Sequence, residues 1–231
     1  MARAAPKIDD SAASACGRLM ALYSRLLVRD VTTQVLFATP LGSRPVVWIS
    51  WHEGNLLTLA VHQRILRRVG IAFVPPGLSG QVMRGWLEGL GIAPVPLAED
   101  ARRGLGLRQM EAAIAGGKDV LIAVDGPRGP RHSIARGALW LAGATGAEVR
   151  PVGSASSLCL RLPRWDRLIV PLPGARNIVA VGAPWPFAEP HRRSSEGFTR
   201  LAAELHGLSR YARVALRAEN FLRPTEAAPW K

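Results

Sequence analysis

Two short stretches of the sequence combine residue types that can activate a substrate and hold an anion. The first is SWHEGN at 50–55, where His52 and Glu53 fall between an apolar run and a segment with helical spacing. A histidine in that position can act as a general base near neutral pH, and the N-terminus of the following helix favours a nearby anion. The alternative is a histidine that only caps the helix or packs on Trp51. The polar residues beside it, at a predicted ligand-binding end, favour the functional interpretation.

The second stretch is VDGPRGPR at 124–131, which continues directly from an apolar run. Its two prolines stiffen the chain, and its two glycines allow another group to approach the backbone closely. Arg128 and Arg131 present guanidinium groups that suit phosphate oxygens, and Asp125 can order an arginine or orient the histidine. A rigid surface turn with solvated arginines is the alternative. Two arginines directly after a buried strand favour an anion-binding loop.

Short apolar runs alternate with helical segments along most of the chain. Strands are predicted at 45–50, 71–76, 92–97, 119–124, 148–156, 166–173 and 177–184. Helices are predicted at 16–27, 54–70, 79–91 with Ser79 as N-cap, 105–117, 134–146, and 193–216 with a break near Gly207. This alternation predicts a three-layer αβα fold, in which helices flank a mostly parallel central sheet. Ligands of such sheets bind at the carboxyl ends of the strands, where both polar stretches fall.

The composition indicates one globular domain with a basic surface. The 231 residues are 48% hydrophobic, and we expect a single domain over 15–217 between flexible tails at 1–14 and 218–231. Lys and Arg number 30 against 17 Asp and Glu, giving a net charge of +13. Such an excess favours an anionic membrane surface, nucleic acid or a phosphate-bearing substrate. Because no nucleic-acid-binding signature accompanies the charge, no nucleic-acid partner is expected.

Several other classes of protein are excluded by missing motifs. Cys16 and Cys159 are too few and too far apart for a disulfide framework or a zinc site, so reduced thiols and no metal are expected. The sequence has neither a P-loop nor a serine nucleophile elbow. It also has no secretory signal and no apolar run long enough to span a bilayer. The amphipathic segment at 16–27 either packs on the core or lies on a lipid surface.

Taken together and in this order, SWHEGN and VDGPRGPR resemble the lysophospholipid acyltransferase-like superfamily. More narrowly, the chain resembles the bacterial group known as domain of unknown function 374, with further matching stretches at 51–57, 124–153 and 165–187. The resemblance covers roughly residues 15 to 215. It implies an acyltransferase that moves a fatty acyl group from an acyl-CoA or acyl-carrier-protein thioester to a phosphorylated lipid or glycolipid acceptor. It implies no other cofactor and a peripheral location on the inner face of the cytoplasmic membrane.

The first superfamily motif, H-x-x-x-x-D, places its general-base histidine at His52, but Leu57 stands where the motif has its acid. Glu53 or Asp125 then supports the ring, or the imidazole works unassisted, or catalysis is impaired. The last case implies a lipid- or anion-binding member of the same fold. The H-x-G-N-type motif of related lipid A acyltransferases also fits at His52 and implies a substrate-binding role for Asn55.

The superfamily's phosphate-binding motif, which resembles E-G-T-R-S, aligns with Asp125, Gly126, Pro127 and Arg128. Arg128 takes the place of the motif's arginine, and Arg131 is a second candidate for binding the acceptor anion. A further motif carries an arginine after an earlier strand, for which Arg102 and Arg103 are candidates. The resemblance predicts that His52 and Arg128 open into the same hollow.

Overall fold

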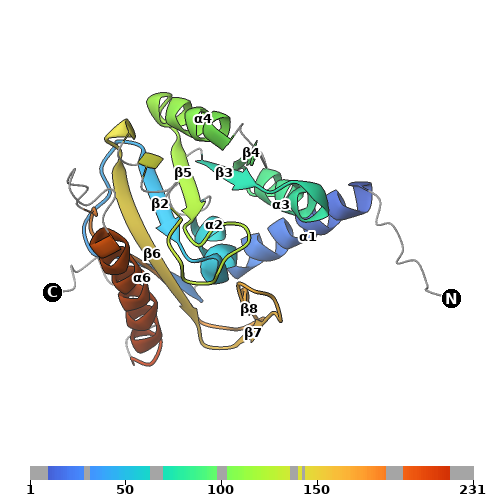
Figure 1. The fold of residues 1–231 in the computed structure, drawn as a ribbon. Helices are drawn as coiled ribbons and strands as arrows, with labels where there is room; N and C mark the ends of the chain where they lie inside the picture. Colours follow the sequence, from blue (N-terminus) through green and yellow to red (C-terminus); the bar gives the residue numbers. More distant parts are fainter. Residues whose placement is uncertain are drawn as a thin grey trace.

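The computed structural model describes residues 10–28, 32–62, 70–97, 103–135, 140–141, 144–185 and 195–218. A seven-stranded sheet in the order β1-β9-β6-β2-β5-β3-β4 forms its centre (Figure 1). The strands are β1 (Thr33–Phe37), β2 (Val46–Ser50), β3 (Gly70–Val74), β4 (Ala93–Pro96), β5 (Asp119–Ala123), β6 (Glu148–Ser156) and β9 (Asn177–Val181). Strands β2 to β6 run parallel to one another. Strands β1 and β9 pair in parallel with each other and run opposite to the rest.

Helices cover both faces of this sheet. They are α1 (Asp10–Leu27), α2 (Asn55–Val61), α3 (Gly77–Gly89), α4 (Arg103–Ala115) and α6 (Ser195–Ala215). Successive side chains of a strand point to opposite faces, so Val46 and Trp48 pack with α1, α2 and α3. Val47 and Ile49 pack with α4 and α6 on the other face. These two cores confirm the predicted three-layer αβα fold with a mostly parallel sheet.

Helix α1 begins at Asp10, so the predicted tail at 1–14 extends too far into the chain. Ala13 is buried, and a Cβ atom on Gly85 of α3 would lie 2.5 Å from the carbonyl oxygen of Ser14. This backbone contact between α1 and α3 requires glycine, and it holds the first turns of α1 against the domain. The rest of the predicted tail, residues 1–9, lies outside the described residues.

Helix α1 packs on the core, which was one of the two alternatives that its sequence pattern left open, and its place on a lipid surface remains a prediction. One of its faces packs on the core through Ala21 and Leu27. The other face exposes three leucines, Leu19, Leu22 and Leu26, which are 67%, 55% and 50% accessible. Among the described residues, no helix combines the length and the apolar character that crossing a membrane requires.

Two predictions about helix boundaries are wrong. Helix α3 starts at Gly77 with Pro76 as its N-cap, so Ser79 lies within the first turn instead of capping it. The fixed φ of proline keeps Pro76 extended, at φ −70° and ψ 166°, and the helix begins directly after it. Helix α6 continues through Gly207, because Leu205 and Leu208 on either side are buried against the sheet. That packing outweighs the weak helix propensity of one glycine.

A second, two-stranded sheet lies beside the main one. It pairs β7 (Cys159–Arg161) with β8 (Ile169–Pro171) in an antiparallel hairpin, and β8 corresponds to the strand predicted at 166–173. Strands β1 and β7 were not predicted. The predicted helices at 134–146 and 54–70 fall partly outside the described residues, as does the predicted C-terminal tail beyond residue 218.

Candidate active site

The two polar stretches meet because they follow neighbouring parallel strands. Strand β2 pairs with β5 so that Ser50 lies opposite Ala123, the last residue of each strand. The Val124 amide donates to the Ser50 carbonyl at 2.9 Å and extends this register by one residue. After each strand the chain turns, at His52 following β2 and at Asp125 following β5. This register brings the two side chains together at the carboxyl edge of the sheet, where parallel sheets bind their ligands.

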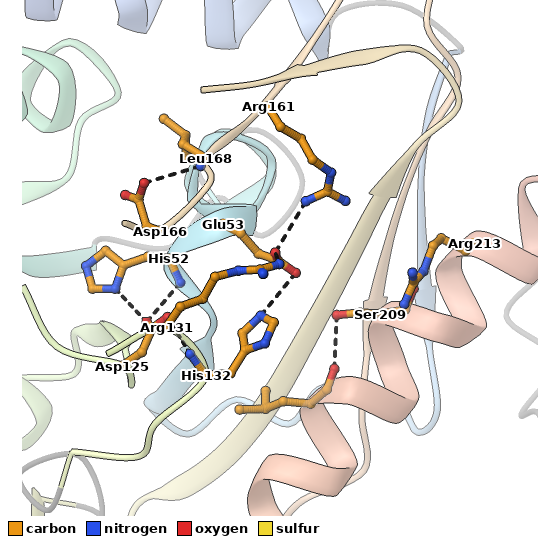
Figure 2. Close-up of polar contacts among 11 residues, drawn as sticks. His52, Glu53, Asp125, Arg131, His132, Arg161, Asp166, Leu168, Ser209 and Arg213 are labelled. Carbon is orange, nitrogen blue, oxygen red and sulfur yellow. Dashed lines mark hydrogen bonds and ion pairs between the residues drawn. The ribbon is translucent and has the colours of Figure 1, made fainter. Parts of the chain in front are cut away.

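His52 and Asp125 form a hydrogen-bonded pair (Figure 2). The distance from His52 Nδ1 to Asp125 Oδ1 is 2.6 Å, and the backbone amide of His52 donates to the same oxygen at 3.0 Å. The carboxylate is fully buried, whereas the imidazole is 17% exposed. Because a carboxylate oxygen accepts at Nδ1, the ring proton resides there and Nε2 is the accepting nitrogen. A buried carboxylate at Nδ1 is an arrangement that can orient a histidine for general-base chemistry.

The carboxylate in contact with His52 comes from Asp125, and the position of the motif's acid is occupied by Leu57. Leu57 is 1% exposed and belongs to the core between the sheet and helices α1 to α3. An ionised side chain in that apolar layer would lose its hydration without gaining a partner. Among the three possibilities left open by the sequence for His52, the structure therefore has the one in which Asp125 supports the ring.

Trp165, which the sequence analysis did not single out, also packs against the His52 ring. The two ring centroids are 5.0 Å apart and the planes meet at 64°, an edge-on contact. Trp165 also fixes the loop after β5, since a Cβ atom on Gly129 would lie 2.7 Å from the indole. Asp166 Oδ1 accepts from the Leu168 amide at 3.3 Å within the hairpin connection that carries Trp165. The imidazole thus has both a carboxylate and an indole as neighbours.

Glu53 does not support His52 but lies among cationic side chains. Arg131 Nη2 contacts Glu53 Oε2, Arg161 Nη1 lies 3.4 Å from the same oxygen, and His132 Nε2 lies 3.5 Å from Oε1 (Figure 2). Burial raises the pKa of Glu53, but the hydrogen bond from Arg131 and the positive charges around the carboxylate together hold it below the ordinary value. Burial lowers the pKa of His132. Glu53 is therefore a carboxylate at neutral pH.

The close approach expected at the two glycines of the loop after β5 occurs at Gly129, against Trp165, but not at Gly126, where the nearest atom to an added Cβ would be 3.9 Å away. Gly126 adopts φ +68° and Gly129 φ +72°, conformations that favour glycine. Pro127 and Arg128 are exposed on this loop. That the side chains of Arg128 and His52 line the same cavity remains a prediction.

For the remaining predicted site residues that it describes, the structure shows burial or position in the fold but not a role in binding. Asn55 is buried, and its Oδ1 lies 3.4 Å from the Ser50 hydroxyl, so its part in substrate binding remains a prediction. Arg103 is the first residue of α4, and Arg102 falls outside the described residues. Within the described ranges, no group of three or more His, Cys, Asp or Glu side chains is arranged to hold a metal ion.

Comparisons with known proteins find similarity to a curated protein and to solved structures. No model of a known protein family matches the chain. An uncharacterised protein of Rickettsia prowazekii, RP090, is 26% identical over 144 residues, which are 62% of this chain and 65% of that protein, slightly under two thirds of its length. The crystal structure of PlsC from Thermotoga maritima, a 1-acyl-sn-glycerophosphate acyltransferase, matches with a TM-score of 0.48 and 16% identity over 93% of this chain and 85% of that one. The similarity to PlsC is too low to assign a fold or an activity to this chain. The fold and the candidate site therefore rest on the geometry of this chain itself.

Proposed function

We propose that this protein is an acyltransferase with His52 as its general base. It moves a fatty acyl group from an acyl-CoA or acyl-carrier-protein thioester to a hydroxyl of a phosphorylated lipid or glycolipid acceptor. The observation that carries the proposal is the His52–Asp125 pair, 2.6 Å apart and directly beside a cationic loop. Its position agrees with the motifs through which the sequence resembles the acyltransferase-like superfamily.

The pair supplies what acyl transfer from a thioester requires. His52 Nε2 takes the proton of the acceptor hydroxyl, and the oxygen attacks the thioester carbonyl. The carbon–sulfur bond then breaks, and the protonated imidazole returns its proton to the leaving thiolate. Asp125 stabilises the transient imidazolium and fixes the ring, as the buried aspartate of a catalytic triad does. Because the thioester is already activated, no cofactor besides the acyl donor is required.

The acceptor anion is bound on the cationic side of the site. Arg128 and Arg131 follow Asp125 on the same loop, and guanidinium groups match phosphate oxygens in shape and charge. Gly126 and Gly129 adopt positive φ in that loop, which continues directly from Asp125.

The membrane surface is part of the same proposal. Helix α1 exposes Leu19, Leu22 and Leu26 and carries Arg18 and Arg25. Exposed leucines beside arginines suit the interface of an anionic bilayer, and each basic residue near such a surface contributes about 1 kcal/mol. The net charge of +13 acts in the same direction. We therefore place the protein as a peripheral protein on the inner face of the cytoplasmic membrane.

The test measures thiol release from acyl-CoA and acyl-carrier-protein donors in the presence of a crude lipid extract. We expect the His52→Ala variant to lose acyl transfer while it keeps its fold and its binding to anionic liposomes. Unchanged turnover in the His52 variant contradicts the proposal. Tight liposome binding without any thioester consumption by the wild type favours a binding protein of the same fold.

A further inference from the structure

Glu53 lies where three segments that are distant in the sequence meet. It follows β2, Arg131 comes from the loop after β5, and Arg161 comes from β7 of the hairpin (Figure 2). The guanidinium nitrogens of both arginines contact the same carboxylate oxygen, Oε2. Two positive charges that converge on one atom repel each other, so this arrangement depends on the carboxylate between them.

The arginines form the outer part of this cluster. The Glu53 side chain is 13% exposed, whereas Arg131 is 30% and Arg161 is 43% exposed. Two guanidinium groups face a single carboxylate, so one positive charge is uncompensated among these three side chains. An anion that approaches from solvent therefore meets guanidinium groups before it meets the carboxylate.

The two arginines of this cluster also have N–H groups that do not contact Glu53. Arg131 Nε is buried and has no acceptor among the described residues. Each guanidinium has five N–H donors, and the contacts with Glu53 engage Nη2 of Arg131 and Nη1 of Arg161. A buried donor without an acceptor is costly, and a ligand oxygen placed there removes that cost.

We propose that Arg131 and Arg161 together bind the phosphomonoester group of the acceptor, with Glu53 holding the two guanidiniums in place. The identity of the acceptor rests on the proposed function above. The new element is Arg161, a specificity-determining residue that the β7–β8 hairpin brings to the site. Because Glu53 directly follows His52, a phosphate bound here places a hydroxyl a few bonds away next to the base. A phosphorylated acceptor is therefore preferred over an uncharged glycolipid.

The first test measures binding of inorganic phosphate to the full chain by titration calorimetry, without any acyl donor. Arg161→Gln should weaken phosphate binding by about tenfold or more, because a charge-assisted hydrogen bond is lost. Arg167→Gln is the matched control, since Arg167 is an exposed arginine of the same hairpin connection. It should change the affinity by less than about twofold. Equal losses in both variants, no loss in Arg161→Gln, or no phosphate binding by the wild type overturns the proposal.

The second test compares a monoacylated acceptor lipid with and without its phosphate group. Arg161→Gln should raise KM about tenfold for the phosphorylated acceptor, leave kcat within a few fold, and not change KM for the dephosphorylated one. Arg161→Lys should restore part of the affinity, because lysine keeps the charge but not the planar group. An equal effect on both acceptors contradicts the assignment.

The two proposals fail separately. If His52→Ala has no effect on turnover while phosphate binding depends on Arg161, the acyltransferase assignment fails and the anion site stands. If turnover depends on His52 but neither test responds to Arg161, only the anion site fails.

Discussion

In the part of the chain that the structure describes, an aspartate–histidine pair lies near each end of β5. At the carboxyl end, Asp125 contacts His52 at 2.6 Å, and at the amino end Asp119 contacts His62 Nε2 at 3.2 Å. Each histidine also has a tryptophan edge-on to its ring, with centroid distances of 5.0 Å for Trp165 and 6.1 Å for Trp48. The same three residue types therefore meet twice, once near each end of β5.

The two pairs differ in access and in the charge around them. His52 is 17% exposed, whereas His62 is 2% exposed. His62 borders a small cavity that is lined mainly by apolar side chains, including Val35, Phe37 and Leu121. Next to His52, by contrast, lie Glu53 and the arginines that contact it. The comparison teaches that hydrogen bonding between histidine and aspartate does not by itself define a catalytic site, because solvent access and nearby charge decide what the pair can do.

The largest expected effect is a loss of activity on substitution at the solvent-accessible pair, His52 and Asp125. Asp125→Asn removes the negative charge that holds the His52 proton on Nδ1 and stabilises the imidazolium. We expect acyl transfer to fall by roughly three to four orders of magnitude, as for the equivalent change in a catalytic triad. The rate of thiol release from the acyl donor measures this loss. A variant with near wild-type turnover would show that His52 does not rely on Asp125.

The corresponding change at the buried pair, Asp119 and His62, should lower the free energy of unfolding and not the activity. Asp119 accepts hydrogen bonds from the Val46 amide at 3.0 Å, from Trp48 Nε1 at 2.8 Å and from His62. Asp119→Asn leaves at least one of these buried donors facing an amide group, at a cost of about 3 kcal/mol. Chemical denaturation measures the loss, and kcat per folded molecule should stay within about twofold. A large loss of kcat would mean that both ends of β5 serve catalysis.

The stability contributed by Asp119 should also depend on pH. Burial raises the pKa of Asp119, but hydrogen bonds from His62, Trp48 and the Val46 amide together bring it below the ordinary value. A lowered pKa means that the contribution is fully present above the unfolded value, about 4, and is lost as pH falls through the folded value. The free-energy difference between wild type and Asp119→Asn should therefore shrink below about pH 4. A difference that stays constant down to acid pH contradicts this account.

A smaller effect is expected from the tryptophan at the exposed pair. Trp165→Ala removes the side chain that packs on His52 and on Gly129, so the imidazole gains freedom to rotate away from its acceptor. We expect kcat to fall roughly ten- to a hundredfold with little change in the acceptor KM, and Trp165→Phe to keep most of the activity. Trp140, which is 46% exposed, provides a control, and Trp140→Ala should leave kcat unchanged. Equal losses in the two alanine variants would remove the positioning role.

The local pattern of apolar runs and helical spacing was sufficient to predict the three layers of the fold. It also predicted that the stretches at 50–55 and 124–131 meet at one edge of the sheet. The apolar runs that became β2 and β5 are short and continuous, as strands buried on both faces are, and parallel neighbours bring their carboxyl ends together. Strand β1 (Thr33–Phe37) was missed, because it is an edge strand of intermediate burial without a distinct pattern. The Gly207 and Ser79 predictions were wrong because packing and the preceding proline outweigh single-residue preferences.

The sequence by itself determined which residue types stand at the ends of the strands, since strand order and loop chemistry are encoded over a few neighbouring residues. Only the tertiary structure decided that Asp125 and not Glu53 supports His52, because that choice depends on the direction of side chains in two separate turns. It also decided the positions of Trp165 and Arg161. Arg161 reaches Glu53 across 108 residues of chain, and a contact over such a separation is set by how the hairpin packs on the sheet.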